Sequence, residues 1–170
     1  MDYFGRVAEL FITVILLFIV PVSYMSARNE LLCQTYVETE TVYFVDSVRN
    51  IGFVDKQMYE TFIRKLSVTN VPYEISMSHY KNKVGNLVSE EATEKEAYYS
   101  YYQGIYHDDM MSEILEENYY YFNKGDFFSV VVRKKGVTWG DYLEYFLTGR
   151  NQNKAEIQVV YGGSIRDESR

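Results

Sequence analysis

A single apolar run dominates the start of the chain. Residues 10–22 read LFITVILLFIVPV, with Thr13 as the one polar residue, and the wider stretch 7–25 adds one charge, Glu9. As a helix rising about 1.5 Å per residue, this stretch reaches roughly 28 Å, close to the hydrocarbon core of about 30 Å. The pattern predicts a short N-terminal segment over 1–6 and a transmembrane helix over 7–25.

The helical pattern does not stop at the end of this span. Between Val22 and Ile51 there is no Gly or Pro, and apolar residues recur on one helical face. Gly52 then follows in the position of a helix-ending glycine. We expect a helical stalk or spine over 26–52, continuous with the span. A helix of that length is unusual in a globular domain and suits a stalk.

The rest of the chain mixes helical and alternating patterns, which is typical of an α+β domain over 53–163. Three helices are expected: Lys56–Ser67, capped by Asp55; one begun by Asp108 or Asp109 and reaching Asn118; and 138–147, ended by Gly149. The expected strands are 73–80, the hairpin strands 119–122 and 127–133, and 157–161, which Gly162-Gly163 stops. Residues 81–96 are polar and suggest a mobile loop, the tract 98–107 is ambiguous, and 164–170 suggest a flexible tail. The predicted fold is a long N-terminal helix packed with shorter helices and a small, mostly antiparallel sheet of about four strands.

Composition narrows the classes of function. The net charge of -7 argues against nucleic acid as a partner, because phosphate binding needs a basic face. One cysteine, Cys33, excludes an intrachain disulfide and a Cys-rich metal site; it fits either an intermolecular disulfide or a buried thiol. The sequence contains no Gly-rich phosphate loop, nucleophile elbow or HExxH. We therefore expect no catalytic residues, no cofactor, no metal and no small-molecule substrate.

The N-terminal run has a second interpretation, a cleaved secretory signal peptide. Small residues are missing at the positions that a cut after Ser26 or Ala27 would need, so a retained anchor is favoured. Its flanking charges are nearly balanced. The two acidic and two basic residues before position 29 cancel, which leaves the whole net charge in 29–170. An acidic domain is repelled by anionic lipid, so we expect a single-pass cell-membrane protein with an extracellular C-terminal domain.

The plan as a whole resembles that of a known family. The stretches that carry the resemblance are AELFITVILLFIVP (8–21), FVDSVRNIGFVDKQMYETFIRKL (44–66), GDFFSVVV (125–132) and VVYGGSIRDE (159–168). They look like TadE-like minor pilins and pseudopilins, the type IV pilin-like proteins of tight-adherence pilus systems, in their Gram-positive versions. The resemblance implies a membrane-anchored assembly subunit whose N-terminal helix packs against other pilin-like subunits. It also implies processing after Gly5, which would leave Glu9 at mature position four where the family has position five.

Within the anchor, the resemblance gives Glu9 a role. In the family the early glutamate pairs with the N-terminal amine of a neighbouring subunit and sets the register of assembly. The alternative is a Glu9 at headgroup level beside Arg6, three residues earlier on the same helical face. Phe11 and Leu16 are expected to pack against neighbouring helices. Pro21 marks either a point of local melting or a helix near its interfacial end.

The tyrosine tract supports an alternative function. Tyr98, Tyr99, Tyr101 and Tyr102 stand in YYSYYQGIYH, and exposed aromatic residues make good binding anchors. The same rings could instead cover a thin core. The alternative function is a membrane-tethered extracellular binding module that recognises a wall polymer or a protein. A cation site at His107, Asp108, Asp109 and Glu113 competes with a capping role for the two aspartates.

Overall fold

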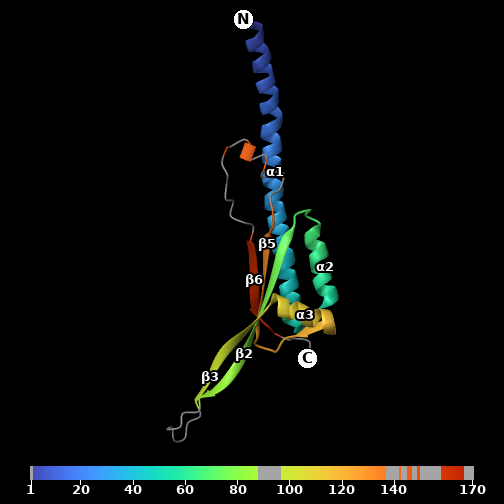
Figure 1. Ribbon diagram of the computed structural model, residues 1–170, viewed down its shortest axis with the longest axis vertical. Coiled ribbons are helices and arrows are strands. Elements are labelled where there is room, and N and C mark those ends of the chain that lie inside the picture. Colours follow the sequence, from blue (N-terminus) through green and yellow to red (C-terminus); the bar gives the residue numbers. More distant parts are fainter. Residues whose placement is uncertain are drawn as a thin grey trace. The chain divides into compact units, whose positions relative to one another are not determined.

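The computed structural model describes residues 2–87, 97–136, 142, 145, 146, 149 and 158–166. The chain forms two compact units. One contains Met1–Tyr36 and Gly136–Ala155, and the other contains Val37–Lys135 and Glu156–Arg170. Helix α1 runs from the first unit into the second (Figure 1).

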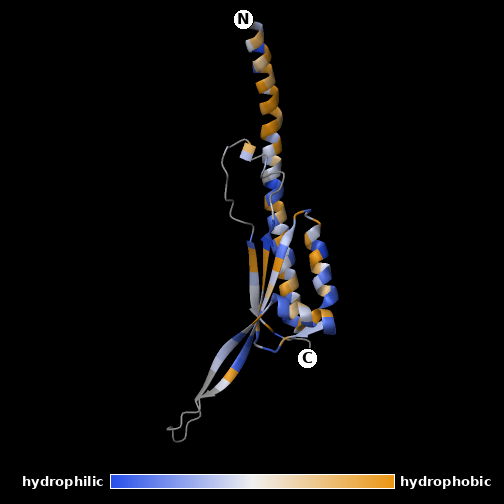
Figure 2. Ribbon diagram, viewed as in Figure 1, coloured by the Kyte–Doolittle hydropathy of each residue, from blue (hydrophilic) through white to orange (hydrophobic). Residues whose placement is uncertain are grey.

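Helix α1, Asp2–Ile51, is unbroken over 50 residues, so the expectation of one helix from the apolar run to Ile51 is confirmed. It ends as predicted at Gly52, whose φ of 79° is in the left-handed region and whose N–H donates to the Val48 carbonyl at 2.8 Å. Figure 2 shows the N-terminal turns as predominantly apolar. Pro21 lies inside the helix.

Helix α2, Lys56–Ser67, is also confirmed. The Asp55 carboxylate accepts a hydrogen bond from the Met58 amide at 2.6 Å, which satisfies one of the free donors at the start of the helix. Tyr59, Phe62 and Leu66 form the buried face. Asn70, with a φ of 56°, lies in the turn that follows.

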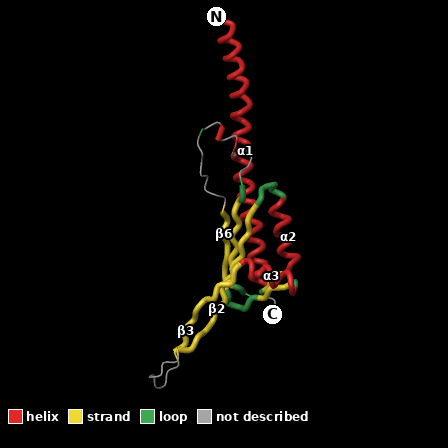
Figure 3. Tube along the Cα trace, viewed as in Figure 1, coloured by secondary structure: helices red, strands yellow, loops and turns green. Residues whose placement is uncertain are grey.

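Two antiparallel sheets follow (Figure 3). The larger has the order β3-β2-β5-β6, formed by β2 (Tyr73–Leu87), β3 (Ala97–Tyr106), β5 (Phe127–Lys134) and β6 (Gln158–Ser164). The smaller pairs β1 (Phe53–Asp55) with β4 (Tyr119–Tyr121). Helix α3, His107–Glu117, connects β3 to β4. The α+β class and the four-stranded antiparallel sheet are as predicted, and the second sheet is additional.

The hairpin expected across residues 123–126 does not form. The turn exists, because the Asp126 N–H donates to the Asn123 carbonyl at 3.0 Å and Gly125 has a φ of 89°. It joins strands of different sheets: β4 pairs with β1, and β5 lies between β2 and β6. A turn sequence specifies the local reversal of the chain, while strand partners depend on distant segments.

The loop expected over 81–96 is wrong in its first part. Strand β2 continues to Leu87, and from Ser78 to Leu87 it pairs with β3, so the ambiguous tract is a strand over 98–106. Pairing of β2 with β5 stops at Tyr80, so 81–87 and 97–103 form a two-stranded ribbon (Figure 1). Such a ribbon buries neither face, so apolar and polar residues need not alternate along it. Its polar sequence therefore resembles that of a loop. Residues 88–96 lie outside the described part.

Two boundaries also differ from expectation, and a third prediction lies largely outside the described residues. The N-cap of α3 is Tyr106, whose side chain makes no capping hydrogen bond. Asp108 and Asp109 lie in the first turn, where their negative charges interact favourably with the helix dipole. Ile165, expected in a flexible tail, is 2% exposed, and its N–H donates to the Asp126 carbonyl at 2.8 Å. The helix expected over 138–147 lies largely outside the described residues. Of its positions, Tyr142, Tyr145 and Phe146 are helical.

Gly162 and Gly163 do not stop the last strand but lie within β6. A Cβ at Gly162 would lie 2.6 Å from Ser129 Cβ on the neighbouring strand, and one at Gly163 would overlap the Arg49 guanidinium. Arg49 Nε donates to the Ser164 carbonyl at 3.0 Å, so the arginine joins α1 to this strand. Close approach therefore explains both glycines.

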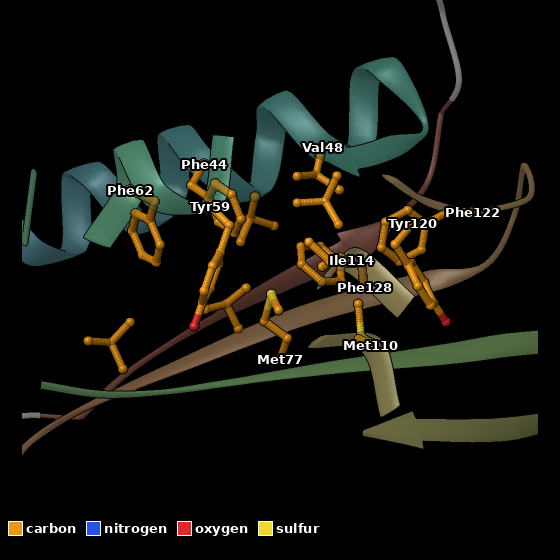
Figure 4. Close-up of a cluster of buried hydrophobic side chains, with 14 of the residues drawn as sticks. Phe44, Val48, Tyr59, Phe62, Met77, Met110, Ile114, Tyr120, Phe122 and Phe128 are labelled. Atoms are coloured by element: carbon orange, nitrogen blue, oxygen red, sulfur yellow. The ribbon is translucent and has the colours of Figure 1, made fainter. Parts of the chain in front are cut away.

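The core of the second unit lies between the last turns of α1, helices α2 and α3, and the inner face of the larger sheet (Figure 4). The rings of Phe44 and Phe62 stack at 4.5 Å, and Phe44 also meets Phe128 edge-on at 6.4 Å. The largest buried side chains include Tyr120, Phe128, Met77, Met110 and Ile114. These contacts make residues 37–51 of α1 an integral part of the domain.

Candidate functional site

The first candidate is the exposed half of α1, residues 3–32. Every described side chain in it is exposed or half-buried, including Phe11 at 64% and Leu16 at 53%. The helix is long and apolar enough to cross a membrane. Exposed apolar surface of this extent requires lipid or partner helices to cover it.

Two hydroxyl groups of this half are satisfied within the helix. The Thr13 hydroxyl donates to the Glu9 carbonyl at 2.9 Å, and the Ser23 hydroxyl donates to the Ile19 carbonyl at 2.8 Å. Such local bonds let hydroxyls enter lipid without an unmade hydrogen bond. The Glu9 side chain is exposed, and a carboxylate beside an apolar span is costly unless it is paired or reaches the interface.

Gly5 and Cys33 lie in the same helix. A Cβ at Gly5 would meet no atom within 4 Å, so this position is open on the helix surface. Cys33 is a half-buried free thiol. Pro21 cannot donate to the Leu17 carbonyl, yet the helix continues past it.

The tyrosine tract forms the second candidate. Tyr98 and Tyr99 belong to β3, and the side chains of Tyr101 and Tyr102 are 44% and 60% exposed. Tyr106, at the end of the same strand, is also exposed, and a Cβ at Gly104 would lie 3.3 Å from its hydroxyl oxygen. The described aromatic residues of β3 are therefore available at the surface.

A buried polar network, Tyr120–His79–Asp126, forms the third candidate. Tyr120 OH lies 2.7 Å from His79 Nδ1, and His79 Nε2 lies 2.9 Å from Asp126 Oδ2. The Asp126 carboxylate also accepts from the amides of Asn82 and Asn123, both at 3.0 Å. Every partner is satisfied if Nε2 carries the proton, because Tyr120 then donates to Nδ1 and His79 donates to the carboxylate.

The pKa shifts agree with this arrangement. Burial lowers the pKa of His79, with Asp126 partly opposing the effect. Burial alone would raise the pKa of Asp126, but hydrogen bonds from Asn82, Asn123 and His79 together hold it below its usual value. Burial raises the pKa of Tyr120, and nearby carboxylates add to this. A neutral histidine and an ionised aspartate are the favoured forms near pH 7.

The buried network resembles a relay of catalytic groups, but its three side chains are 0–2% exposed. A substrate cannot reach a histidine that is fully buried between a tyrosine and a carboxylate. The network has a structural effect on the sheet. Pairing of β2 with β5 ends at Tyr80, and Asp126 then accepts from Asn82 in place of a strand neighbour. The buried network thus marks where the sheet gives way to the ribbon.

A cleft of about 360 Å³ lies between α1 and α2, with walls that include Tyr43, Phe44, Met58 and Phe62. Lys65 crosses it, with its ammonium 2.7 Å from the Glu40 carboxylate and 4.8 Å from the centre of the Tyr43 ring. The ammonium of Lys65 and the carboxylate of Glu40 form an ion pair in this cleft. This leaves the aromatic and polar walls as the surface open to a ligand.

The cation site considered at His107 is not supported. Within the described residues, no three His, Cys, Asp or Glu side chains gather closely enough to hold a metal ion. His107 instead accepts a hydrogen bond from the Met77 amide at 3.4 Å and lies against the Tyr59 ring. Burial lowers its pKa, although Asp108 opposes the effect.

The sequence interpretation missed the buried network. His79 fitted the alternation of a strand, Asp126 fitted a turn, and Tyr120 fitted a hairpin strand, so none stood out. The one available signal was His79 itself, a polar residue at an inward position of a strand otherwise lined by Ile75 and Met77. Its partners lie 41 and 47 residues further along the chain.

Comparison with known proteins finds no match for this chain among protein-family models, curated proteins or solved structures.

Proposed function

We propose that this chain is a membrane-anchored assembly subunit, similar to a minor pilin or pseudopilin. Helix α1 inserts in the cell membrane and packs against other pilin-like subunits, while the α+β unit is held outside. The observation that carries the proposal is that one unbroken helix exposes apolar side chains over residues 3–32 and supplies core residues from Val37 onward. The proposed anchor and part of the domain core therefore belong to the same helix.

Helix packing is the expected mode of assembly. In lipid there is no hydrophobic drive for helices to associate, so contacts depend on side-chain fit and on polar groups that find a partner. Phe11 and Leu16 offer the packing surface, and Glu9 offers the polar group. The net charge of -7 on the part beyond the anchor supports an extracellular position, because the anionic cytoplasmic leaflet repels it.

Photo-crosslinking of the full-length protein in its native membrane tests the proposal. A photo-reactive residue replaces Leu16, and a matched control carries it at Leu115, which is 60% exposed on α3. Ladders of adducts with itself or with pilin-like proteins from position 16, absent from position 115, support assembly. Adducts to lipid alone would contradict helix packing.

The exposed tyrosines favour a second function, a tethered module that binds a wall polymer. Aromatic rings offer flat contact area at little cost in side-chain entropy. If this function is correct, replacing Tyr101 and Tyr102 by Ser weakens sedimentation of the full-length protein with insoluble wall material. The Leu115→Ser variant serves as the control, and equal sedimentation of both variants would contradict the binding function.

A further inference from the structure

The ribbon, residues 81–87 and 97–103, has two edges of opposite character. On the β2 side, the edge beyond Tyr80 carries Lys81 and Lys83. Lysines on an edge discourage another strand from pairing there. On the β3 side, all ten residues, AYYSYYQGIY, are uncharged and none is proline. Only one edge of the ribbon therefore has the usual protection.

Strand β3 is also an edge of the whole sheet, and among the described residues no strand pairs with its outer side. A long, uncharged edge is a template for strand addition. The opposite edge, β6, is shorter and contains Gly162 and Gly163, which have no side chains to pair across strands. Of the two edges, β3 is the better suited to pairing.

At alternate positions, on the face that carries Tyr102, the residue types of β3 are mirrored about Tyr102. Tyrosines stand four positions away on both sides, and the small residues Ser100 and Gly104 stand two positions away. On that face, an antiparallel pair of identical strands centred on Tyr102 therefore places tyrosine against tyrosine and small residue against small residue. On the opposite face the same register places Tyr101 against Gln103 and Tyr99 against Ile105, which are uncharged pairs. Cross-strand aromatic pairs of this kind stabilise sheets. A strand with this symmetry is complementary to itself.

We propose that β3 pairs with β3 of a second copy of this chain, antiparallel and with the two-fold axis at Tyr102. The contact is isologous and joins two four-stranded sheets into one of eight strands. Each chain has a net charge of -7, but β3 is uncharged, so no like charges of the two β3 strands face each other in this contact. The pairing does not depend on helix packing in the membrane, so it goes beyond the proposed function.

Symmetric disulfide formation tests both the partner and the register. In the full-length protein in detergent micelles, with Cys33 replaced by Ser, the Tyr102→Cys variant is oxidised with diamide. The two sulfurs at the axis lie on directly opposed residues, within disulfide reach, so a covalent dimer is expected. Ser100→Cys is the matched control. It lies on the same strand, but its two copies are offset by four residues, about 13 Å, and stay monomeric.

A charge at the axis gives an independent measurement. Tyr102→Lys places two ammonium groups opposite each other, and we expect dimerisation measured by sedimentation to weaken about tenfold or more. Val84→Lys adds the same charge to an equally exposed position on β2 and leaves dimerisation unchanged. Unchanged thermal unfolding of both variants shows that they fold.

The outcomes separate this proposal from the proposed function. A disulfide at position 102 without helix crosslinks from position 16 supports the strand contact and contradicts helix packing. Helix crosslinks without a disulfide at 102 overturn the strand contact and leave helix packing supported. Equal disulfide yields from positions 102 and 100 would also overturn it, because random collision does not distinguish register.

Discussion

The two halves of helix α1 differ both in apolar content and in surroundings: 20 of the 30 residues 3–32 are hydrophobic, against 7 of the 15 residues 37–51. In the exposed half, residues 3–32, most described side chains are exposed, and the half-buried positions Ile19, Ser23, Ser26 and Glu30 fall on one helical face. In the buried half, residues 37–51, Val37, Val45 and Val48 are fully buried, while Tyr43 is exposed. The exposed half is long and apolar enough to cross a membrane, whereas the buried half presents one apolar face to a protein core.

Truncation in the buried half has the largest expected effect. Phe44 is 5% exposed and stacks on Phe62, so Phe44→Ala removes a large core side chain and leaves a cavity. We expect the free energy of unfolding to fall by about 3–5 kcal/mol. Urea unfolding of the full-length protein, followed by near-ultraviolet circular dichroism, measures it. Leu16→Ala is the control in the exposed half, and equal losses would contradict the contrast between the halves.

A charge in the exposed half acts on membrane insertion. Leu16→Arg disfavours insertion by about 3 kcal/mol, because arginine is costly and leucine favourable near the centre of a span. We expect more protein to be released from membranes by alkaline carbonate. The same substitution at Leu115 adds the charge to an exposed site on α3 and leaves the membrane fraction unchanged. Full retention of Leu16→Arg would argue against a spanning helix.

The buried network extends the comparison of the two halves of α1 to polar groups, because Tyr120, His79 and Asp126 lie in the same unit as the buried half. Asp126→Asn replaces a carboxylate that accepts from Asn82, Asn123 and His79 with an amide that must turn a donor toward one of them. One buried donor left unsatisfied costs about 1–3 kcal/mol, which urea unfolding measures. Asp109→Asn, at an exposed position in α3, has little effect. A loss of the same size in both would contradict a role specific to Asp126.

The smallest expected effect is a dependence of stability on pH. The pKa of His79 is lowered in the folded protein, so below about pH 6.5 the unfolded chain binds a proton that the folded chain does not. Stability therefore falls from pH 7.5 to pH 5. The carboxylate of Asp126, whose pKa is also lowered, loses its contribution only below about pH 4.

The variant His79→Asn isolates this effect. We expect a smaller difference in the free energy of unfolding between pH 7.5 and pH 5 than in the parent protein. Asp109→Asn, at an exposed position of α3, is the control, and His107→Asn measures the separate contribution of the other histidine, whose pKa is also lowered. A pH dependence unaltered by His79→Asn would show that this histidine does not carry it.

Elements with local causes were predictable. Asp55 caps α2 through a residue three positions away, and Gly52 ends α1 through a bond to a residue four positions away. The strand partners were not predictable in the same way. The turn at 123–126 indicated a hairpin, yet β5 pairs with β2, about fifty residues earlier, and with β6. The alternation of apolar and polar residues along a strand does not specify which distant strand pairs with it.

By itself, the sequence determined the apolar N-terminal stretch, the single long helix and the helix that Asp55 begins, because helical period, caps and glycine stops act over a few residues. Only the tertiary structure decided that β4 leaves the main sheet, that Gly162 and Gly163 lie inside a strand, and that His79 meets Tyr120 and Asp126. Those features depend on contacts between distant segments. Such contacts form only when the core brings the segments together, and the local pattern of residues does not record them.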